Sequence, residues 1–320
     1  MTRSPDGSIA PDAAVTQRFT AALTRLNPGG ERIGLAVSGG PDSMAMLLLA
    51  DAAIPNGFEV ATVNHGLRSE AAAECALVTE VCTARGIACA VLAVQLAPGN
   101  VQNEARRARY GALAGWARQR GLAMLATAHH ADDQAETLLM RLNRGSGVAG
   151  LAGVREVGEM AGIRVIRPML GFRRFELAEV VAESGIDPVQ DPSNADPHYD
   201  RVRMRQSLAT CDWLDPLALV HSAGLLADAE QALSAFENAL WPDHVTQSRV
   251  GFVLYPPVVP LMRVRMVRRI IAAMGGNPRG GDAARLVERL ERGERGNVGG
   301  VLATVKGGEW VFVLEPARRA

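Results

Sequence analysis

Six consecutive residues near the N-terminus have the types that bind a phosphate group: Ser38, Gly39, Gly40, Pro41, Asp42 and Ser43. Glycines let the backbone approach a phosphate closely, and a helix that begins here presents unpaired N–H groups with positive dipole character. The serine hydroxyls add hydrogen-bond donors, and the Asp42 carboxylate is suited to hold Mg²⁺ against phosphate oxygens. The loop lacks the lysine of the G-x-x-x-x-G-K-S/T motif, which argues against a kinase or a motor ATPase. The alternative interpretation is a tight strand–helix turn in which Asp42 only caps the helix.

A second stretch, residues 128–137, combines two histidines with three acids: His129, His130, Asp132, Asp133 and Glu136. Asp133 and Glu136 are three residues apart, so their carboxylates project from one face of a helix. Two such carboxylates suit an ammonium group or Mg²⁺. The dipole at a helix N-terminus favours acids and would explain one or two of the three, so we interpret the stretch as a binding site.

Both stretches follow short apolar runs, which alternate with longer amphipathic segments from about residue 31. The pattern predicts strands at 33–37, 60–64, 90–96, 122–128 and 164–169, and helices at 42–53, 70–85, 101–120, 132–143 and 172–184. Apolar strands separated by helices predict an α/β fold with a doubly wound parallel sheet that is covered on both faces. Such sheets bind ligands at the carboxyl edge, so we expect the two stretches to face one shared pocket.

The pattern changes after residue 187, where a stretch to residue 200 with three prolines predicts an ordered loop. Beyond it, helices are predicted at 217–240 and 260–274, and a hairpin is predicted at 301–314 around Gly307-Gly308. We therefore expect three parts. They are an N-terminal segment at 1–30, a catalytic α/β domain at 31–212, and a smaller, mostly helical C-terminal domain of α+β character at 213–320.

The composition limits other classes of function. The chain carries 34 basic and 34 acidic residues, and this zero net charge argues against non-specific nucleic-acid binding unless arginines cluster locally. Lys306 is the only lysine, so a mechanism that needs a catalytic lysine would have to use it. The four cysteines, Cys75, Cys82, Cys89 and Cys211, form no C-x-x-C pair and are expected to be buried free thiols. No apolar run approaches the roughly 20 residues that cross a bilayer, and no secretory signal is evident, so we expect a soluble cytoplasmic protein.

The phosphate loop resembles the S-G-G-x-D-S signature of the PP-loop ATP pyrophosphatases, which split ATP into AMP and pyrophosphate. Further stretches narrow the resemblance to the tRNA(Ile)-lysidine synthase family. They span about residues 32–206 and include Val63-Asn64-His65-Gly66-Leu67-Arg68, residues 104–110 and 128–137, Arg144-Gly145-Ser146-Gly147, Arg167-Pro168-Met169-Leu170 and Asp191-Pro192-Ser193-Asn194. One departure is Val202, which stands where many relatives have the asparagine of an R-N-R-x-R run.

The resemblance implies an ATP- and Mg²⁺-dependent ligase. Such an enzyme joins free L-lysine to C2 of the wobble cytidine, position 34, of a CAU-anticodon tRNA(Ile), through an adenylated cytidine. Residues 38–43 would bind ATP, with Mg²⁺ at Asp42, and Asp133 and Glu136 would recognise lysine. A carboxylate or His129 would accept the proton that the lysine amine must lose before it attacks.

Two further residues, His65 and Arg68, follow the second predicted strand and are assigned to ATP or the target base. The alternative for His65 is a structural hydrogen-bond partner, which is about as common. The implied catalytic set therefore remains Asp42, His129, Asp133 and Glu136.

Arginine clusters suit a folded RNA, because a guanidinium group pairs with phosphate through two parallel hydrogen bonds. The implied tRNA contacts are Arg106, Arg109, Arg201, Arg203 and Arg205. The C-terminal domain adds a seven-residue window without an acid, which contains Arg263, Arg265, Arg268 and Arg269. The alternative for each cluster is a solvated helix face. A homodimer is an option that the sequence leaves open.

The sequence leaves two other functions open. One is another PP-loop enzyme, such as a tRNA thiolase or an amidotransferase-type synthetase, but thiolases of this group typically use paired cysteines that the sequence lacks. The other is a non-catalytic nucleotide- or RNA-binding protein with the same fold. The presence of Asp42, Asp133 and Glu136 argues against it.

Overall fold

The computed structural model describes residues 11–64, 70–94, 101–189, 198, 200–278 and 281–315. The chain forms two compact units that divide after Ala227, inside one long helix, α9 (Pro216–His244). The boundary predicted from the sequence lies before this helix, at residue 213. A helix that two units share leaves no loop or change of composition at the division, so the sequence carries no signal there.

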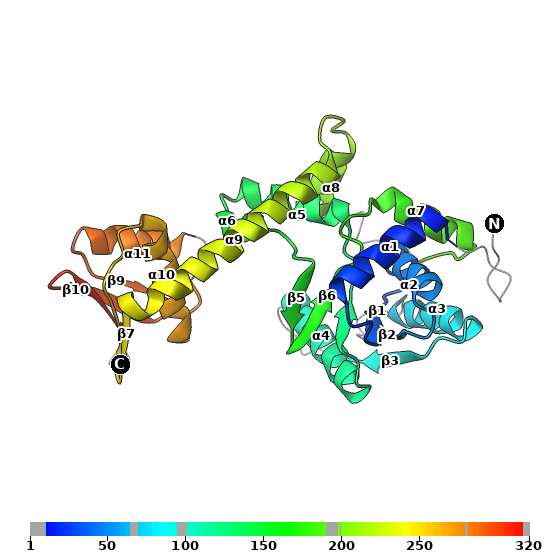
Figure 1. The fold of residues 1–320 in the computed structure, drawn as a ribbon, viewed down its shortest axis with the longest axis horizontal. Helices are drawn as coiled ribbons and strands as arrows, with labels where there is room; N and C mark the ends of the chain where they lie inside the picture. The colour runs from blue at the N-terminus through cyan, green and yellow to red at the C-terminus, as the bar shows by residue number, and fades with distance from the viewer. Residues whose placement is uncertain are drawn as a thin grey trace. The chain divides into compact units, whose positions relative to one another are not determined.

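The first unit is built on a mainly parallel sheet. Within the described residues, six strands lie in the order β3-β2-β1-β4-β6-β5 (Figure 1). They are β1 (Ile33–Ala36), β2 (Phe58–Asn64), β3 (Cys89–Ala93), β4 (Met124–Ala126), β5 (Val157–Met160) and β6 (Ile163–Ile166). All neighbours run parallel except β5, which pairs antiparallel with β6 at the edge. The strand order changes direction between β1 and β4, which is where doubly wound sheets bind ligands.

Helices cover both faces of this sheet. The helices of the first unit that precede α9 are α1 (Ala13–Leu26), α2 (Pro41–Ala53), α3 (Glu70–Ala84), α4 (Val101–Gln119), α5 (Ala131–Asn143), α6 (Val148–Leu151), α7 (Arg174–Ser184) and α8 (Asp200–Ala209). Residues of α1, α2, α3 and α7 share one apolar core with Ile33 and Leu35 of β1, whereas α4 packs into a second core with β4. The predicted doubly wound α/β fold is confirmed.

Gly34 is required by close packing at the centre of the sheet. A Cβ atom there would lie 2.7 Å from the Trp116 ring and 2.8 Å from the Leu125 side chain. We expect Gly34→Ala to lower the free energy of unfolding by about 1–3 kcal/mol, because overpacking forces its neighbours out of their preferred rotamers. Urea unfolding measures this change.

The matched control is Gly111→Ala, on the exposed side of α4 with open space around it. Alanine is the better helix former, so this variant should be unchanged or more stable by up to about 1 kcal/mol. Equal losses in the two variants would show that the packing at Gly34 is not the cause.

The predicted strands and helices of this unit all occur, with ends that differ by a few residues. Four elements were not predicted, namely α1, β5, α6 and α8. Strand β5 is only partly buried and has no continuous apolar run, so no strand pattern marked it. Helix α1 lies in the predicted N-terminal segment, yet its Phe19, Leu23 and Leu26 are buried in the first core, so this segment belongs to the first unit.

The second unit combines helices with an antiparallel sheet. Five described strands lie in the order β7-β8-β11-β10-β9. They are β7 (Val245–Ser248), β8 (Gly251–Leu254), β9 (Gly296–Val298), β10 (Val301–Lys306) and β11 (Glu309–Leu314), and α10 (Pro260–Ala273) and α11 (Asp282–Glu291) pack against them. The hairpin predicted around Gly307-Gly308 is confirmed as the β10–β11 pair, whose two turn glycines have φ of 58° and 86°. The other three strands were not predicted, and they make this unit richer in sheet than expected.

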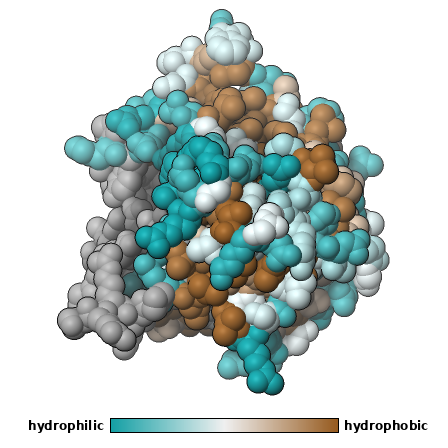
Figure 2. All heavy atoms as spheres, turned by 90° about the vertical axis from the view of Figure 1, so that its left-hand side faces the viewer, coloured by the Kyte–Doolittle hydropathy of each residue, from teal (hydrophilic) through white to brown (hydrophobic). Residues whose placement is uncertain are grey.

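The surface carries no single large area of one kind in the view of Figure 2, where hydrophilic and hydrophobic side chains alternate in small areas. Exposed large apolar residues of the second unit are Phe236, Val250, Tyr255, Val258, Val259, Leu261 and Leu314. Among the described helices, none has both the length and the apolar character needed to span a bilayer.

Candidate active site

The phosphate loop connects β1 to α2 and is held by its own side chains. The Ser43 hydroxyl donates to the Gly40 carbonyl at 3.0 Å and accepts from the Ser38 backbone N–H at 3.1 Å. Helix α2 begins at Pro41, which has no N–H group and suits the first helical position. The other N–H groups of the first turn point out of the N-terminal end of the helix. Gly39 adopts φ +83°, a conformation that favours glycine. The local structure is therefore one that suits an anion.

The acidic stretch forms the first turn of α5, directly after β4. Asp132 accepts hydrogen bonds from the Arg174 backbone N–H at 2.7 Å and from Arg173 Nε at 3.3 Å, and so ties α5 to the start of α7. Asp133 Oδ2 accepts the His130 backbone N–H at 3.3 Å. The three predicted acids thus have different surroundings, because Asp132 faces α7 while Asp133 and Glu136 face α8.

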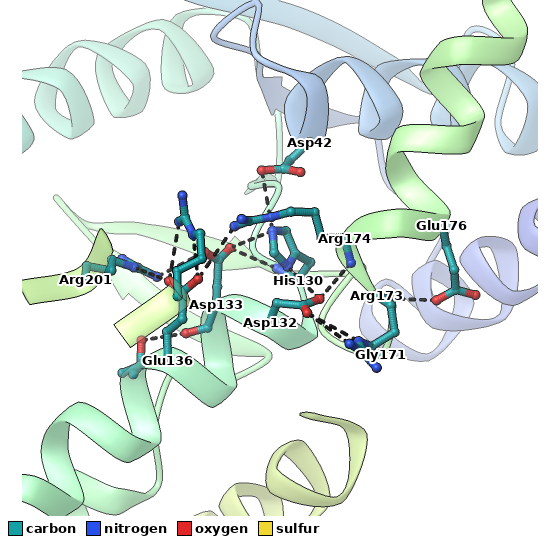
Figure 3. A network of polar contacts seen from close by, with 12 residues as sticks. Asp42, His130, Asp132, Asp133, Glu136, Gly171, Arg173, Arg174, Glu176 and Arg201 are labelled. Carbon is teal, nitrogen blue, oxygen red and sulfur yellow. Dashed lines mark hydrogen bonds and ion pairs between the residues drawn. The ribbon is translucent and has the colours of Figure 1, made fainter. Parts of the chain in front are cut away.

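His130 joins the phosphate loop to the acidic turn. Its fully buried ring lies 3.4 Å from Asp42 Oδ2, 3.6 Å from Asp132 Oδ2 and 3.5 Å from Asp133 Oδ2 (Figure 3). These separations exceed ideal hydrogen-bond lengths, so the attraction is mainly Coulombic. Burial lowers the pKa of His130, but contact with the Asp132 and Asp42 carboxylates outweighs burial and raises it to about 9. The ring is therefore a buried cation among carboxylates at neutral pH.

Asp133 and Glu136 are bridged by the guanidinium group of Arg201 from α8. Arg201 Nε lies 2.9 Å from Glu136 Oε2, and Arg201 Nη2 lies 3.1 Å from Asp133 Oδ1 (Figure 3). Arg205 Nε donates to Glu136 Oε1 at 2.8 Å, and Arg174 Nη2 lies 3.7 Å from the same oxygen. Burial raises the pKa of Asp133, but the charges of His130 and Arg201 outweigh it and hold this pKa below its usual value. Asp133 is therefore ionised, and both carboxylates are already paired with cations.

The expectation that the phosphate loop and the acidic turn meet at one edge is confirmed by the contacts of His130 with both.

Residues 11–211 match the PP-loop domain family. The chain is 45% identical over 315 residues to the tRNA(Ile)-lysidine synthase of Novosphingobium aromaticivorans, an alignment that covers 96% of each chain. It is 36% identical over 303 residues to that of Zymomonas mobilis, with 92% of this chain and 91% of the relative covered. The chain belongs to the tRNA(Ile)-lysidine synthase family.

Membership of this family makes the chain a ligase whose PP-loop domain uses ATP. Among solved structures, a U34-tRNA thiolase from Methanococcus maripaludis matches with a TM-score of 0.53 and 17% identity, over 67% of this chain and 78% of the thiolase. That likeness concerns the fold alone.

All four cysteines of the chain are free, and Cys75 and Cys82 are buried as predicted, whereas Cys89 and Cys211 are half-buried.

His129, the predicted proton acceptor, differs sharply from its neighbour His130. Its Nδ1 lies 3.0 Å from the Thr127 hydroxyl. Burial lowers the pKa of His129 to about 4, and the charges of Arg167 and Arg106 contribute to this lowering. The ring is therefore neutral at neutral pH, and one of the two nitrogens of a neutral imidazole is an acceptor.

Asp42 in the phosphate loop is the residue that would bind the implied Mg²⁺ ion. The Asp42 side chain is 32% exposed, and of its two oxygens Oδ2 faces His130. The described residues hold no group of three or more His, Cys, Asp or Glu side chains that could bind a metal without other ligands. Mg²⁺ is usually bound through one or two carboxylates together with substrate phosphates. Asp42 beside the phosphate loop fits an ion that arrives with a nucleotide.

The predicted RNA-binding arginines divide into several environments. Arg106 and Arg109 are exposed on α4 and lie 5.2 and 5.4 Å from the Tyr110 ring, and Arg203 is exposed and paired with Asp200. Arg201 and Arg205 instead bind the acidic turn. Val202 stands where many relatives have an asparagine. Its side chain is buried, so an apolar group replaces the amide at a packed position.

In the second unit, most of the predicted arginine cluster is engaged in internal contacts. Arg265 pairs with Glu230 and Glu237 at 2.8 and 2.9 Å. Arg263 pairs with Glu291, and Arg269 lies 3.9 Å from the Trp241 ring. Arg268 is exposed and has no ion pair with any described residue. The window therefore mainly stabilises this unit.

The sequence placed His130 and Asp132 in the acidic stretch but gave neither a role of its own. The contact of Arg174 with Glu136 was not predicted, because it depends on how α5 and α7 pack. The predicted residues His65 and Arg68, and the motif segments at 65–68 and 191–194, lie outside the described residues.

Gly39→Ala is expected to weaken ATP binding at least about tenfold. A φ of +83° strains any other residue by about 1–2 kcal/mol, and a Cβ atom would lie 3.1 Å from the Glu74 carbonyl oxygen, so the loop must shift. Equilibrium binding of ATP measures the effect. The control is Gly86→Ala, which has φ +67° in a turn with open space, and should lose stability but keep its ATP affinity. Unchanged ATP affinity in Gly39→Ala would mean that the loop conformation does not control binding.

Proposed function

We propose that this chain ligates free L-lysine to C2 of the wobble cytidine, position 34, of a tRNA(Ile) with a CAU anticodon. The observation that supports this most directly is the position of His130, 3.4 Å from Asp42 of the phosphate loop and 3.5 Å from Asp133 of the acidic turn. Because one side chain contacts both segments, an ATP site at the phosphate loop and an ammonium site at the acidic turn would be close enough for an activated base and an amine to meet. Family membership supports the same reaction.

The proposed reaction has two steps. The cytidine O2 attacks the α-phosphorus of ATP, the bond to the β-phosphate oxygen breaks, and pyrophosphate leaves. The lysine ε-amine then attacks C2, the C2–O2 bond breaks, and AMP leaves with the oxygen. Mg²⁺ bound near Asp42 would neutralise phosphate charge. The backbone N–H groups of residues 38–43 would stabilise the charge that develops on the phosphates.

The lysine amine must lose a proton before it attacks, because an ammonium group has no lone pair. Asp133 and Glu136 suit the ammonium form, since both are carboxyl side chains on one face of α5. His129 is the neutral acceptor beside them, with its pKa near 4. A base that weak holds the proton only briefly, so it would pass it on to water.

The proposed tRNA contacts are five arginines of the first unit. Arg106 and Arg109 are exposed on α4, whereas Arg201, Arg203 and Arg205 lie on α8. Phosphate contacts position a nucleic acid without reading its sequence, so the choice of tRNA(Ile) requires further contacts.

The test is incubation of the full chain with ATP, Mg²⁺, labelled lysine and bulk tRNA. Label should enter one tRNA species, with one AMP and one pyrophosphate released for each lysine that is incorporated. Pyrophosphate release that needs neither lysine nor tRNA would contradict the proposal. A parallel incubation with a labelled sulfur donor separates this function from thiolation, because only a thiolase would produce labelled tRNA there.

A further inference from the structure

The site proposed for the lysine ammonium already contains a cation from the chain itself. Arg201 binds both carboxylates at once, with Nε 2.9 Å from Glu136 Oε2 and Nη2 3.1 Å from Asp133 Oδ1. An ammonium group that bridged Asp133 and Glu136 would use the same two oxygens. Lysine and Arg201 therefore cannot both occupy this position.

The three arginines around Glu136 differ in how readily they can leave. The side chains of Arg205 and Arg174 are 28% and 34% exposed, and both approach Oε1. Arg201 is 45% exposed, takes Oε2, and is the only one of the three that also reaches Asp133. If Arg201 turned outward, Glu136 would keep its contacts with Arg205 and Arg174. Asp133 Oδ1 would lose its contact with Arg201, and Glu136 Oε2 would keep only the 3.5 Å contact with Arg205 Nη2, and these are the oxygens that a lysine ammonium needs.

Moving Arg201 away from the two carboxylates costs free energy, so a new interaction must compensate for it. Glu136 is 1% exposed and Asp133 is 16% exposed, and a buried carboxylate without a cation is strongly destabilised. Arg201 itself loses two charge-assisted hydrogen bonds. An RNA phosphate can replace both bonds, because a guanidinium group pairs with phosphate in the same bidentate way. Arg203 is exposed on the same helix, and although it pairs with Asp200, it can also contact a phosphate that approaches this position.

We propose that Arg201 occupies the lysine position in the free protein, and that an RNA phosphate which pairs with Arg201 opens this position to lysine. This inference rests on the proposed function. RNA and lysine then bind cooperatively, and by thermodynamic linkage each raises the affinity of the other by the same factor. Lysine is admitted mainly when the RNA that will receive it is bound.

The experiment measures lysine affinity of the full chain by calorimetry without ATP, so that no ligation occurs. The wild-type protein is titrated with L-lysine alone and then in the presence of a CAU-anticodon tRNA(Ile) transcript. We expect RNA to tighten lysine binding about tenfold or more. Norleucine, which lacks the ε-ammonium group, should show no RNA-dependent binding. If the transcript binds but leaves lysine affinity unchanged, the inference is wrong, and this result needs no variant.

Arg201→Gln gives the second measurement, with Arg203→Gln as its matched control on the same helix. Removal of the Arg201 charge should tighten lysine binding about tenfold in the absence of RNA and abolish the RNA dependence. Arg203→Gln should weaken RNA binding but leave the RNA-free lysine affinity unchanged. Unchanged or weaker lysine binding by Arg201→Gln would show that Arg201 does not compete with lysine.

A parallel ligation assay separates failure of this inference from failure of the proposed function. Wild-type ligation together with RNA-independent lysine affinity would overturn only the role of Arg201. No lysine binding by any variant, with no label in tRNA, would overturn the proposed function itself. Thermal unfolding of both variants, compared with the wild type, confirms that the folded protein is measured.

Discussion

Asp133→Asn is expected to reduce transfer of labelled lysine to tRNA about a thousandfold. The amide keeps the size of the side chain but removes the charge that faces His130, Arg201 and the proposed lysine ammonium. Loss of one partner from a buried charge pair costs about 3–5 kcal/mol, which corresponds to a rate decrease of this order. The measurement is kcat/KM for lysine at saturating ATP and tRNA.

The Asp133 variant should still bind ATP, because the phosphate loop and Asp42 are unchanged. Asp200→Asn is the control, since it removes a carboxylate that is 55% exposed and pairs with Arg144 and Arg203 at the surface. Such pairs contribute about 0–1 kcal/mol, so its ligation rate should remain within about fivefold of the wild type. Ligation by Asp133→Asn at more than a tenth of the wild-type rate would exclude Asp133 as the lysine-binding carboxylate.

His130→Gln is expected to lower the free energy of unfolding by about 3 kcal/mol below pH 6.5, and this loss should disappear at high pH. The folded-state pKa of His130 is raised to about 9 from its usual 6.5. A raised pKa stabilises the folded protein fully below pH 6.5, and this stabilisation is lost as the pH rises through about 9. Urea unfolding of both proteins at pH 6 and pH 10, without nucleotide or Mg²⁺, measures the difference.

His129→Gln is the matched control for this pH dependence. Burial lowers the pKa of His129 to about 4, so its ring is neutral throughout the same range. Only the unfolded state binds a proton at His129 near pH 6, so this variant should gain about 1 kcal/mol relative to the wild type at pH 6 compared with pH 10, a change opposite in sign to that of His130→Gln. If His130→Gln shows a pH-independent difference, the ring of His130 is not a cation in the folded protein.

The sequence by itself determined the frame of the site. Apolar runs at 33–37 and 122–128 predicted two buried strands, and the glycine-serine turn and the acidic stretch each follow one of them. The carboxyl ends of parallel strands lie at one edge of a sheet, so these two stretches had to meet. Strand and helix periodicity are local properties, which is why the sequence carried them. The antiparallel strand β5 and three strands of the second unit lack a comparable local pattern and were missed.

Only the tertiary structure decided the charges and partners within that frame. His129 and His130 are adjacent and chemically identical, yet burial lowers the pKa of one to about 4 while nearby carboxylates raise the other to about 9. Arg201 binds Asp133 and Glu136 across 68 and 65 positions of sequence. No sequence pattern encodes such a pairing, because it depends on how α8 packs against α5. Desolvation and Coulomb forces act through space, so they follow from the folded positions of these groups and not from their order along the chain.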